Sequence, residues 1–226
     1  MLMGAGLLFL STSSSLSAQD TKIKIVVDAS RDGGTWWFPQ EKKIFDPGKP
    51  HKGKFFADYL RKVSQEMIEI APGETVVDQF KEATLVVRFN AYGPPYREEE
   101  VTAYKDYVMK GGSVLLVYGA PLKGSADAVA DELGVKFGQA AQTPFIKKWA
   151  NHPITTGLKD VPFMTGSVIS GFPESATQLA TMANGQSIFG MAPVGKGKII
   201  YLGSFAPLIG MSQPFTERVV AELLKK

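Results

Sequence analysis

The sequence contains no cysteine among its 226 residues, and it contains only two histidines, His51 and His152. The first absence excludes disulfide bonds, thiolate metal sites and a cysteine nucleophile. The two histidines stand far apart and outside any close-spaced ligand motif, so the sequence indicates no zinc site. We therefore expect a chain that uses neither a metal ion nor another cofactor.

A strong charge of one sign is also missing. The formal net charge is +3, and the chain has no run of five or more basic residues. Nucleic-acid-binding domains concentrate basic residues on one face or in one stretch. We therefore expect no nucleic-acid partner.

Long hydrophobic runs are absent as well. The apolar stretch from Met1 to Leu10 is too short to span a bilayer. Serine-rich residues and then Ala18 follow it, as in a secretory signal, although no Lys or Arg precedes the run. We expect residues 1–18 to be a cleaved signal peptide and residues 19–226 to form one secreted or periplasmic domain, with no stable membrane insertion. The alternative is an N-terminal membrane anchor.

Alternating apolar segments indicate an α/β domain. Continuous apolar runs of the kind found in buried parallel strands occur at 23–27, 83–89, 113–118 and 198–203. Segments with helical spacing lie between or after them, at 55–63, 97–110, 124–133 and 215–225. This order predicts a doubly wound, mainly parallel, flavodoxin-like sheet with helices on both faces. Residues 136–175 contain four prolines, and we expect short strands within an irregular excursion there.

Three segments resemble one superfamily. They are EEEVTAYKDYVMKGGSVLLVYG from Glu98, ANHPITTGL from Ala150 and GKGKIIYLGSF from Gly195. Together they resemble the class I glutamine amidotransferase-like superfamily, in particular its trehalose-utilisation-like branch. The resemblance implies an α/β fold over about residues 22–226.

The resemblance also implies what this chain does not do. Catalytic members carry a cysteine directly after the strand that matches residues 113–118. Here the corresponding residues are Tyr118, Gly119, Ala120 and Pro121, without cysteine or serine. Glutamine amidotransfer is therefore excluded, and the chain resembles non-catalytic relatives that serve in binding or assembly.

Polar and aromatic residues gather after the first strand, where open α/β sheets bind their ligands. A carboxylate pair with a guanidinium could orient a polyol or bind a cation, or it could simply hold the loop together. Adjacent tryptophans could stack on a sugar or on a partner, or they could plug the end of the sheet. Other strand ends and one histidine turn converge on this edge. The candidate ligand-binding residues are Asp28, Ser30, Arg31, Asp32, Gly33, Trp36, Trp37, Asn90, Tyr118, His152 and Ser204.

These residues favour a binding module over an enzyme. We expect an exported, non-catalytic domain that binds a small polar ligand, such as a carbohydrate, or a protein partner. One alternative is a carbohydrate-active hydrolase or lyase that uses Asp28 or Asp32 with a histidine as acid and base. Another is a purely structural assembly module. Catalysis requires a carboxylate within reach of a histidine, and binding requires an exposed Trp36 or Trp37.

Overall fold

The computed structural model describes residues 22–32, 37, 52–89, 94–119, 127–210 and 212–225. The first half of the chain forms β1 (Lys24–Asp28), α1 (Lys54–Val63), β2 (Glu66–Ile70), β3 (Leu85–Phe89), α2 (Glu98–Met109), β4 (Ser113–Val117) and α3 (Ala128–Glu132). The second half forms β5 (Lys136–Ile146), β6 (Lys148–Trp149), β7 (Val161–Gly171), β8 (Thr177–Thr181), β9 (Ser187–Val194), β10 (Gly197–Leu202), the 3-10 turn η2 (Ala206–Leu208) and α4 (Gln213–Leu224).

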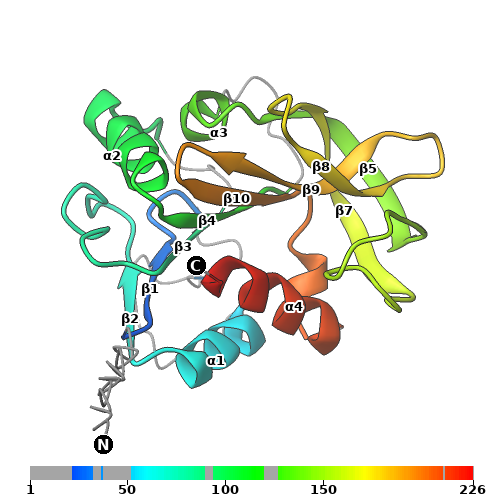
Figure 1. Cartoon of the computed structure of the whole chain (residues 1–226), viewed down its shortest axis with the longest axis horizontal. Helices are drawn as coiled ribbons and strands as arrows, with labels where there is room; N and C mark the ends of the chain where they lie inside the picture. Colours follow the sequence, from blue (N-terminus) through cyan, green and yellow to red (C-terminus); the bar gives the residue numbers. More distant parts are fainter. Residues whose placement is uncertain are drawn as a thin grey trace, which may run out of the picture.

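The sheet has ten strands and consists of two different halves (Figure 1). Its main order is β2-β1-β3-β4-β10-β9-β7-β5. The pairs from β2 to β10 are parallel. The pairs from β10 to β5 are antiparallel, as are the β8 pairs with β9 and β6. The prediction of a doubly wound, mainly parallel, flavodoxin-like sheet is therefore wrong, because half of the sheet is an antiparallel extension.

The antiparallel half contains the segment that we expected to be irregular. Strands β5 and β7 have 11 residues each and pair from Lys136 with Gly171 to Ile146 with Val161. Two prolines are tolerated in this ribbon. Pro144 lies in the edge strand β5, and Pro162 lies in a part of β7 that pairs only with β5, since β7 meets β9 at Ile169 alone. Long-range pairing, which local periodicity does not record, makes these residues strands.

Hydrophobic side chains fill both faces of the sheet. On one face, Ile25 and Val27 of β1 pack in a cluster with α1 and α4. On the other face, Val26 packs in a second cluster with Tyr104 of α2 and Val129 of α3. The alternation follows the two-residue period of a strand, and burial on both faces explains why β1, β3 and β4 have apolar residues at consecutive positions.

The ribbon crosses the end of β10 at very short range. A Cβ atom at Gly166 would lie 2.0 Å from the carbonyl oxygen of Gly203, and one at Gly203 would lie 2.1 Å from that of Ser167. The backbone amide of Ser167 donates to Gly203 O, with N and O 2.8 Å apart. Only glycine at both positions permits this contact. Across the described residues, no helix is both long enough and apolar enough to cross a membrane.

Candidate functional site

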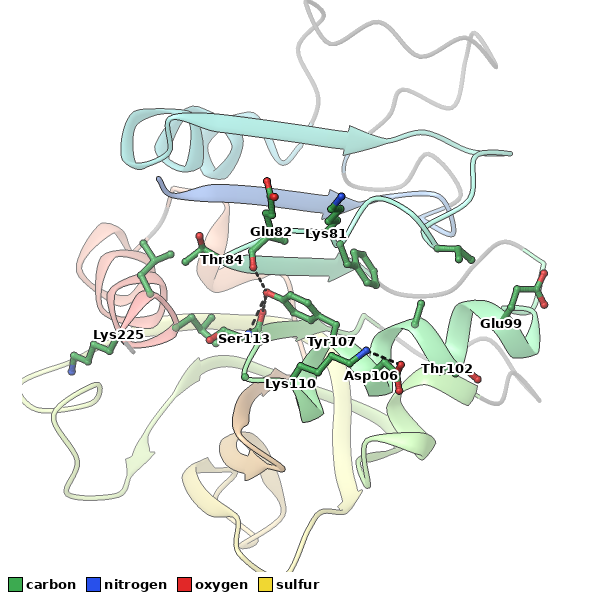
Figure 2. Close-up of a pocket in the computed structure, with 18 residues that line it drawn as sticks. Lys81, Glu82, Thr84, Glu99, Thr102, Asp106, Tyr107, Lys110, Ser113 and Lys225 are labelled. Carbon is green, nitrogen blue, oxygen red and sulfur yellow. Dashed lines mark hydrogen bonds and ion pairs between the residues drawn. The ribbon is translucent and has the colours of Figure 1, made fainter. Parts of the chain in front are cut away.

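The amino edge of the parallel strands carries a cavity of about 790 Å³. Figure 2 shows Tyr107 reaching from α2 toward Ser113, at the start of β4. The Tyr107 hydroxyl lies 3.3 Å from the carbonyl oxygens of Ala83 and Ser113 and accepts from the Ser113 amide. Burial raises the pKa of Tyr107. Three lysines and three acidic residues line the cavity. Their charges balance, so the lining does not favour a charged ligand of either sign.

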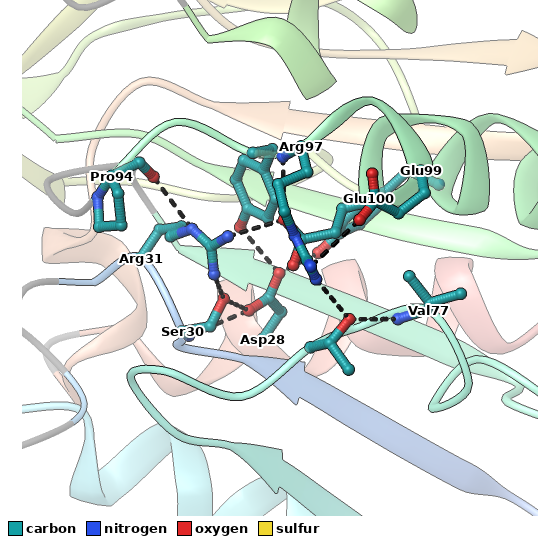
Figure 3. Close-up of polar contacts among 11 residues, drawn as sticks. Asp28, Ser30, Arg31, Val77, Pro94, Arg97, Glu99 and Glu100 are labelled. Carbon is teal, nitrogen blue, oxygen red and sulfur yellow. Dashed lines mark hydrogen bonds and ion pairs between the residues drawn. The ribbon is translucent and has the colours of Figure 1, made fainter.

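The carboxyl edge of the same strands carries the predicted polar cluster (Figure 3). Asp28, the last residue of β1, is fully buried. Its Oδ1 accepts from the Ser30 amide at 3.0 Å and from the Ser30 hydroxyl at 2.6 Å. Its Oδ2 accepts from the hydroxyls of Tyr96 at 2.7 Å and Tyr104 at 2.6 Å. Four donors therefore stabilise one buried carboxylate and occupy both of its oxygens.

Arg31 connects this carboxylate to helix α2. Its Nε donates to Pro94 O at 3.0 Å, its Nη1 to the Ser30 hydroxyl at 3.0 Å, and its Nη2 to Glu100 Oε2 at 2.7 Å. Glu100 also accepts from the Arg97 amide at 2.9 Å, which caps the first turn of α2. The guanidinium lies 4.7 Å from the centre of the Tyr96 ring. One arginine thus ties β1, the loop before α2 and α2 itself together.

The network raises the pKa values of its own tyrosines. Burial raises the pKa of Tyr96 well above its ordinary value, and the nearby Asp28 charge raises it further. The same two causes, in the same order, raise the pKa of Tyr104. Both hydroxyls therefore stay protonated and donate to Asp28. Both oxygens of Asp28 are therefore occupied by donors from its own chain.

A second buried ion pair lies beside the first. Arg88 of β3 is fully buried, and its Nη2 donates to Asp127 Oδ2. Burial lowers the pKa of Arg88, but the charge and hydrogen bond of Asp127 together with the nearby Tyr96 and Tyr104 raise it by more, so the pKa lies above its ordinary value. Asp127 Oδ1 accepts from the Ala130 amide at 3.1 Å and so caps α3.

Trp37 closes the edge and does not face solvent. Only 1% of its surface is exposed, and its ring stacks on Phe89 with centroids 5.0 Å apart. Its backbone amide donates to Asp32 Oδ2 at 2.9 Å, and its indole Nε1 donates to Glu69 Oε1 at 2.9 Å. Two roles were expected for the tryptophans, stacking on a ligand or partner and plugging the end of the sheet, and Trp37 has the second. Trp36, Gly33 and Asn90 lie outside the described residues.

The remaining candidates also serve the fold. Tyr118 is buried and stacks on Phe137, with ring centroids 4.3 Å apart. The Ser204 hydroxyl is buried and donates toward Phe163 O at 2.5 Å. His152 Nδ1 accepts from the Ile154 amide at 3.2 Å and so shapes its own turn. The hydrogen-bond donors to Asp28 among the described residues are Ser30 and two tyrosines, so His152 does not complete a catalytic pair with it.

Sequence analysis missed four members of the network: Tyr96, Tyr104, Glu100 and Arg88. Tyr104 has the helical spacing of a core residue, and Glu100 belongs to an acidic first turn, so each has an ordinary explanation from the sequence alone. Arg88 is a charged residue in an otherwise apolar strand, and this feature of the sequence could have identified it as part of the site. Among the residues with a described position, no group of three His, Cys, Asp or Glu side chains could hold a metal ion.

Comparisons with known proteins place the chain in one family. The family model described as "Domain of unknown function (DUF7408)" matches residues 54–211, which is more than half of the chain. A comparison with the curated proteins finds no match. The resemblance to the glutamine amidotransferase-like superfamily is therefore corrected, because a different family model matches. The segments behind it are helix ends, turns and strands that many α/β chains share.

Solved structures share the fold at low sequence identity. The N-terminal domain of mmIFT52 has a TM-score of 0.65 and 15% identity, with 89% of this chain and 98% of that chain covered. The cytoplasmic protein STM1381 from Salmonella typhimurium LT2 has a TM-score of 0.62 and 16% identity, with 90% and 100% covered. A β-galactosidase from Rahnella sp. R3 has a TM-score of 0.58 and 17% identity, with 90% of this chain but only 31% of the enzyme covered.

Proposed function

The chain belongs to the DUF7408 family, and we propose that it is a non-catalytic structural module that acts by contact with a protein partner. One observation carries the proposal. Asp28 occupies the position where this kind of sheet presents functional groups, yet it is fully buried and accepts four hydrogen bonds from its own chain. A general acid or base must reach the proton that it transfers. Asp28 instead accepts hydrogen bonds from the loop after β1, from the loop before α2 and from α2 itself, and so holds these three segments together.

The antiparallel ribbon offers the surface for a partner. Phe145 of β5 is 39% exposed and Met164 of β7 is 51% exposed. Met164 pairs with Thr143, two residues before Phe145, so the two apolar side chains belong to neighbouring positions of the ribbon. The backbone of Met164 has a φ of +60°, a conformation that costs energy for a residue with a side chain. Exposed apolar side chains held by strained backbone support a contact surface.

Photo-crosslinking in cells of the source organism tests this proposal. A benzoylphenylalanine at position 145 should give one defined adduct, and the same probe at position 55 should not. Phe55 of α1 is a matched control because it is an aromatic residue with 37% exposure on a different element. Met164→Ser should reduce the adduct at position 145 by more than about tenfold, as expected for truncation of an interface hot spot. Equal adducts at both positions, or none at position 145, would contradict the proposal.

A carbohydrate-related function is the second candidate. It is favoured by the fold that the chain shares with part of several β-galactosidases. If the chain hydrolyses glycosides with Asp28 as acid or base, nitrophenyl glycosides should be cleaved and Asp28→Asn should abolish cleavage. If the structural proposal holds, neither the wild-type protein nor the variant should release nitrophenol above the buffer rate.

A further inference from the structure

The two buried arginines at the carboxyl edge differ in one respect. Every guanidinium nitrogen of Arg31 has an acceptor, namely Pro94 O, Ser30 Oγ and Glu100 Oε2. Arg88 is fully buried, yet within the described part of the chain its Nε and Nη1 have no acceptor. Its single hydrogen bond runs from Nη2 to Asp127. The fold satisfies one guanidinium completely and leaves two nitrogens of the other available.

Unpaired guanidinium nitrogens in the interior are costly. Leaving a buried donor without an acceptor costs about 1–3 kcal/mol, and more when the group is charged. Arg88 stands near the end of β3 and pairs in register with Asp28 of β1 and Leu116 of β4. This is the edge of a parallel sheet at which ligands bind. An acceptor supplied from outside the chain would remove the penalty at a position where the fold ordinarily accepts one.

The surrounding charges decide which acceptor fits. The network that contains Arg31 and Arg88 also contains the carboxylates of Asp28, Glu100 and Asp127. Arg97 Nε also lies 3.4 Å from Glu100 Oε2, so three guanidiniums balance the three carboxylates and the network has no net charge. It therefore has no excess positive charge to offset the desolvation of an anionic ligand at this depth. Glu100 Oε1, although buried, has no donor among the described residues. The network thus offers donors and an acceptor together, which a hydroxyl group matches and a carboxylate does not.

We propose that Arg88 Nε and Nη1 donate to oxygen atoms of a small neutral hydroxylated ligand, a polyol or a sugar, enclosed at the carboxyl edge of β1, β3 and β4. The ligand would lie against Tyr96, whose ring centre is 5.8 Å from the Arg88 guanidinium carbon. This inference does not depend on the partner surface of the β5–β7 ribbon, and either can fail without the other.

Side-chain NMR tests it on the folded protein. The Nε–H resonances of Arg88 and Arg31 are recorded while glycerol or D-galactose is added, with overnight equilibration because Arg88 is enclosed. Inorganic phosphate and acetate are the anionic probes at constant ionic strength. We expect a saturable shift of the Arg88 signal with a neutral probe and no shift of the Arg31 signal, whose acceptor is Pro94 O. Saturation separates binding from the general stabilisation that sugars and polyols exert by exclusion from protein surfaces.

Two outcomes would overturn the proposal. If neither neutral probe moves the Arg88 signal, the site does not take a hydroxylated ligand. If phosphate or acetate alone moves it, the ligand class is anionic and our charge argument is wrong. Arg88→Lys assigns the resonance, and Arg88→Met with Asp127→Asn removes the charged pair together and keeps an oxygen to cap α3. In that double variant the saturable rise of the unfolding temperature with D-galactose should be lost.

Discussion

At the scale of single residues, the buried arginines at the carboxyl edge are held in ion pairs with buried carboxylates. The side chains of Arg31 and Glu100 are 7% and 0% exposed, with Nη2 and Oε2 2.7 Å apart. A pair of this kind does not have to stabilise the fold relative to an apolar pair of the same shape. The loss of one partner is nevertheless severe, because the other charge remains buried.

We therefore predict that Arg31→Met lowers the free energy of unfolding by about 3–5 kcal/mol, since it removes the closer and more buried of the two cations that pair with the Glu100 carboxylate. Arg31→Met combined with Glu100→Gln should cost less than the sum of the two single changes. Lys105→Met, in the exposed pair with Glu132, is the control and should leave stability unchanged within error. Urea denaturation measures all four. Additive costs of the two buried changes would show that the residues do not act as a pair.

At the scale of elements, the attachment of the ribbon to the parallel half depends on one close backbone contact. Strand β7 passes over the end of β10 at Gly166 and Gly203, where either glycine lacks room for a side chain. Strand β7 touches β9 in register only at Ile169, so the glycine contact carries much of the junction. The geometry of the ribbon is therefore set by backbone packing more than by side-chain interdigitation.

Gly166→Ala should accordingly destabilise the protein by at least about 2 kcal/mol, because the new Cβ meets a carbonyl oxygen that cannot move without shifting β10. Gly171→Ala in the same strand is the matched control. The nearest atoms to a Cβ there are Lys136 side-chain carbons at 3.2–3.4 Å, and a small shift of the edge strand β5 relieves that contact. Thermal unfolding of both variants gives the comparison. Equal stability of the two would mean that the contact at Gly166 is not restrictive.

At the scale of the whole molecule, the face of the sheet that α2 and α3 cover buries a group of tyrosines in their protonated form. Burial raises the pKa of Tyr201 to about 12, and the pKa values of Tyr96, Tyr104 and Tyr107 are also raised, with burial as the first cause in each case. Unfolding would expose all four to water, where a tyrosine titrates near pH 10. The folded and unfolded states therefore bind different numbers of protons at alkaline pH.

This difference predicts an alkaline loss of stability. Below pH 10 both states keep the tyrosine protons and the full stability is present. As pH rises above 10 the unfolded state releases protons that the folded state retains, so the free energy of unfolding falls by up to about 1.4 kcal/mol per pH unit for each such tyrosine. Urea midpoints from pH 9 to 11.5 measure the slope. Tyrosinate absorbance of the folded protein checks the cause, and titration of all seven tyrosines near pH 10 would refute it.

The sequence predicts the strands of the parallel half of this molecule more completely than those of the antiparallel half. Strands β1, β3, β4 and β10 and helix α2 lie close to their predicted ranges, because each is a continuous apolar or periodic run with a local end signal. Strands β5 and β7 are specified by cross-strand pairs up to 35 residues apart, such as Lys136 with Gly171, and prolines and glycines hide them from local analysis.

The predicted site shows the same division. Residue type and position identified Asp28, Ser30 and Arg31 as one cluster, and the structure joins them by hydrogen bonds. Whether such a cluster faces a ligand or staples the fold depends on what lies opposite it. Here the opposite groups are the hydroxyls of Tyr96, just before α2, and of Tyr104, within α2. Both residues lie more than 60 positions after Asp28 in the chain. No local pattern reports that contact.

Asp28 stabilises the fold by accepting four hydrogen bonds at the carboxyl edge of the sheet. The direct measurement is the free energy of unfolding of Asp28→Ala from urea denaturation, with Asp58→Ala on the exposed side of α1 as control. We predict a loss of about 3 kcal/mol or more for Asp28→Ala, because two buried tyrosine hydroxyls lose their acceptor, and no measurable change for Asp58→Ala. An Asp28→Ala variant as stable as the wild-type protein would show that Asp28 does not stabilise the fold, and this carboxylate would again be a candidate catalytic group.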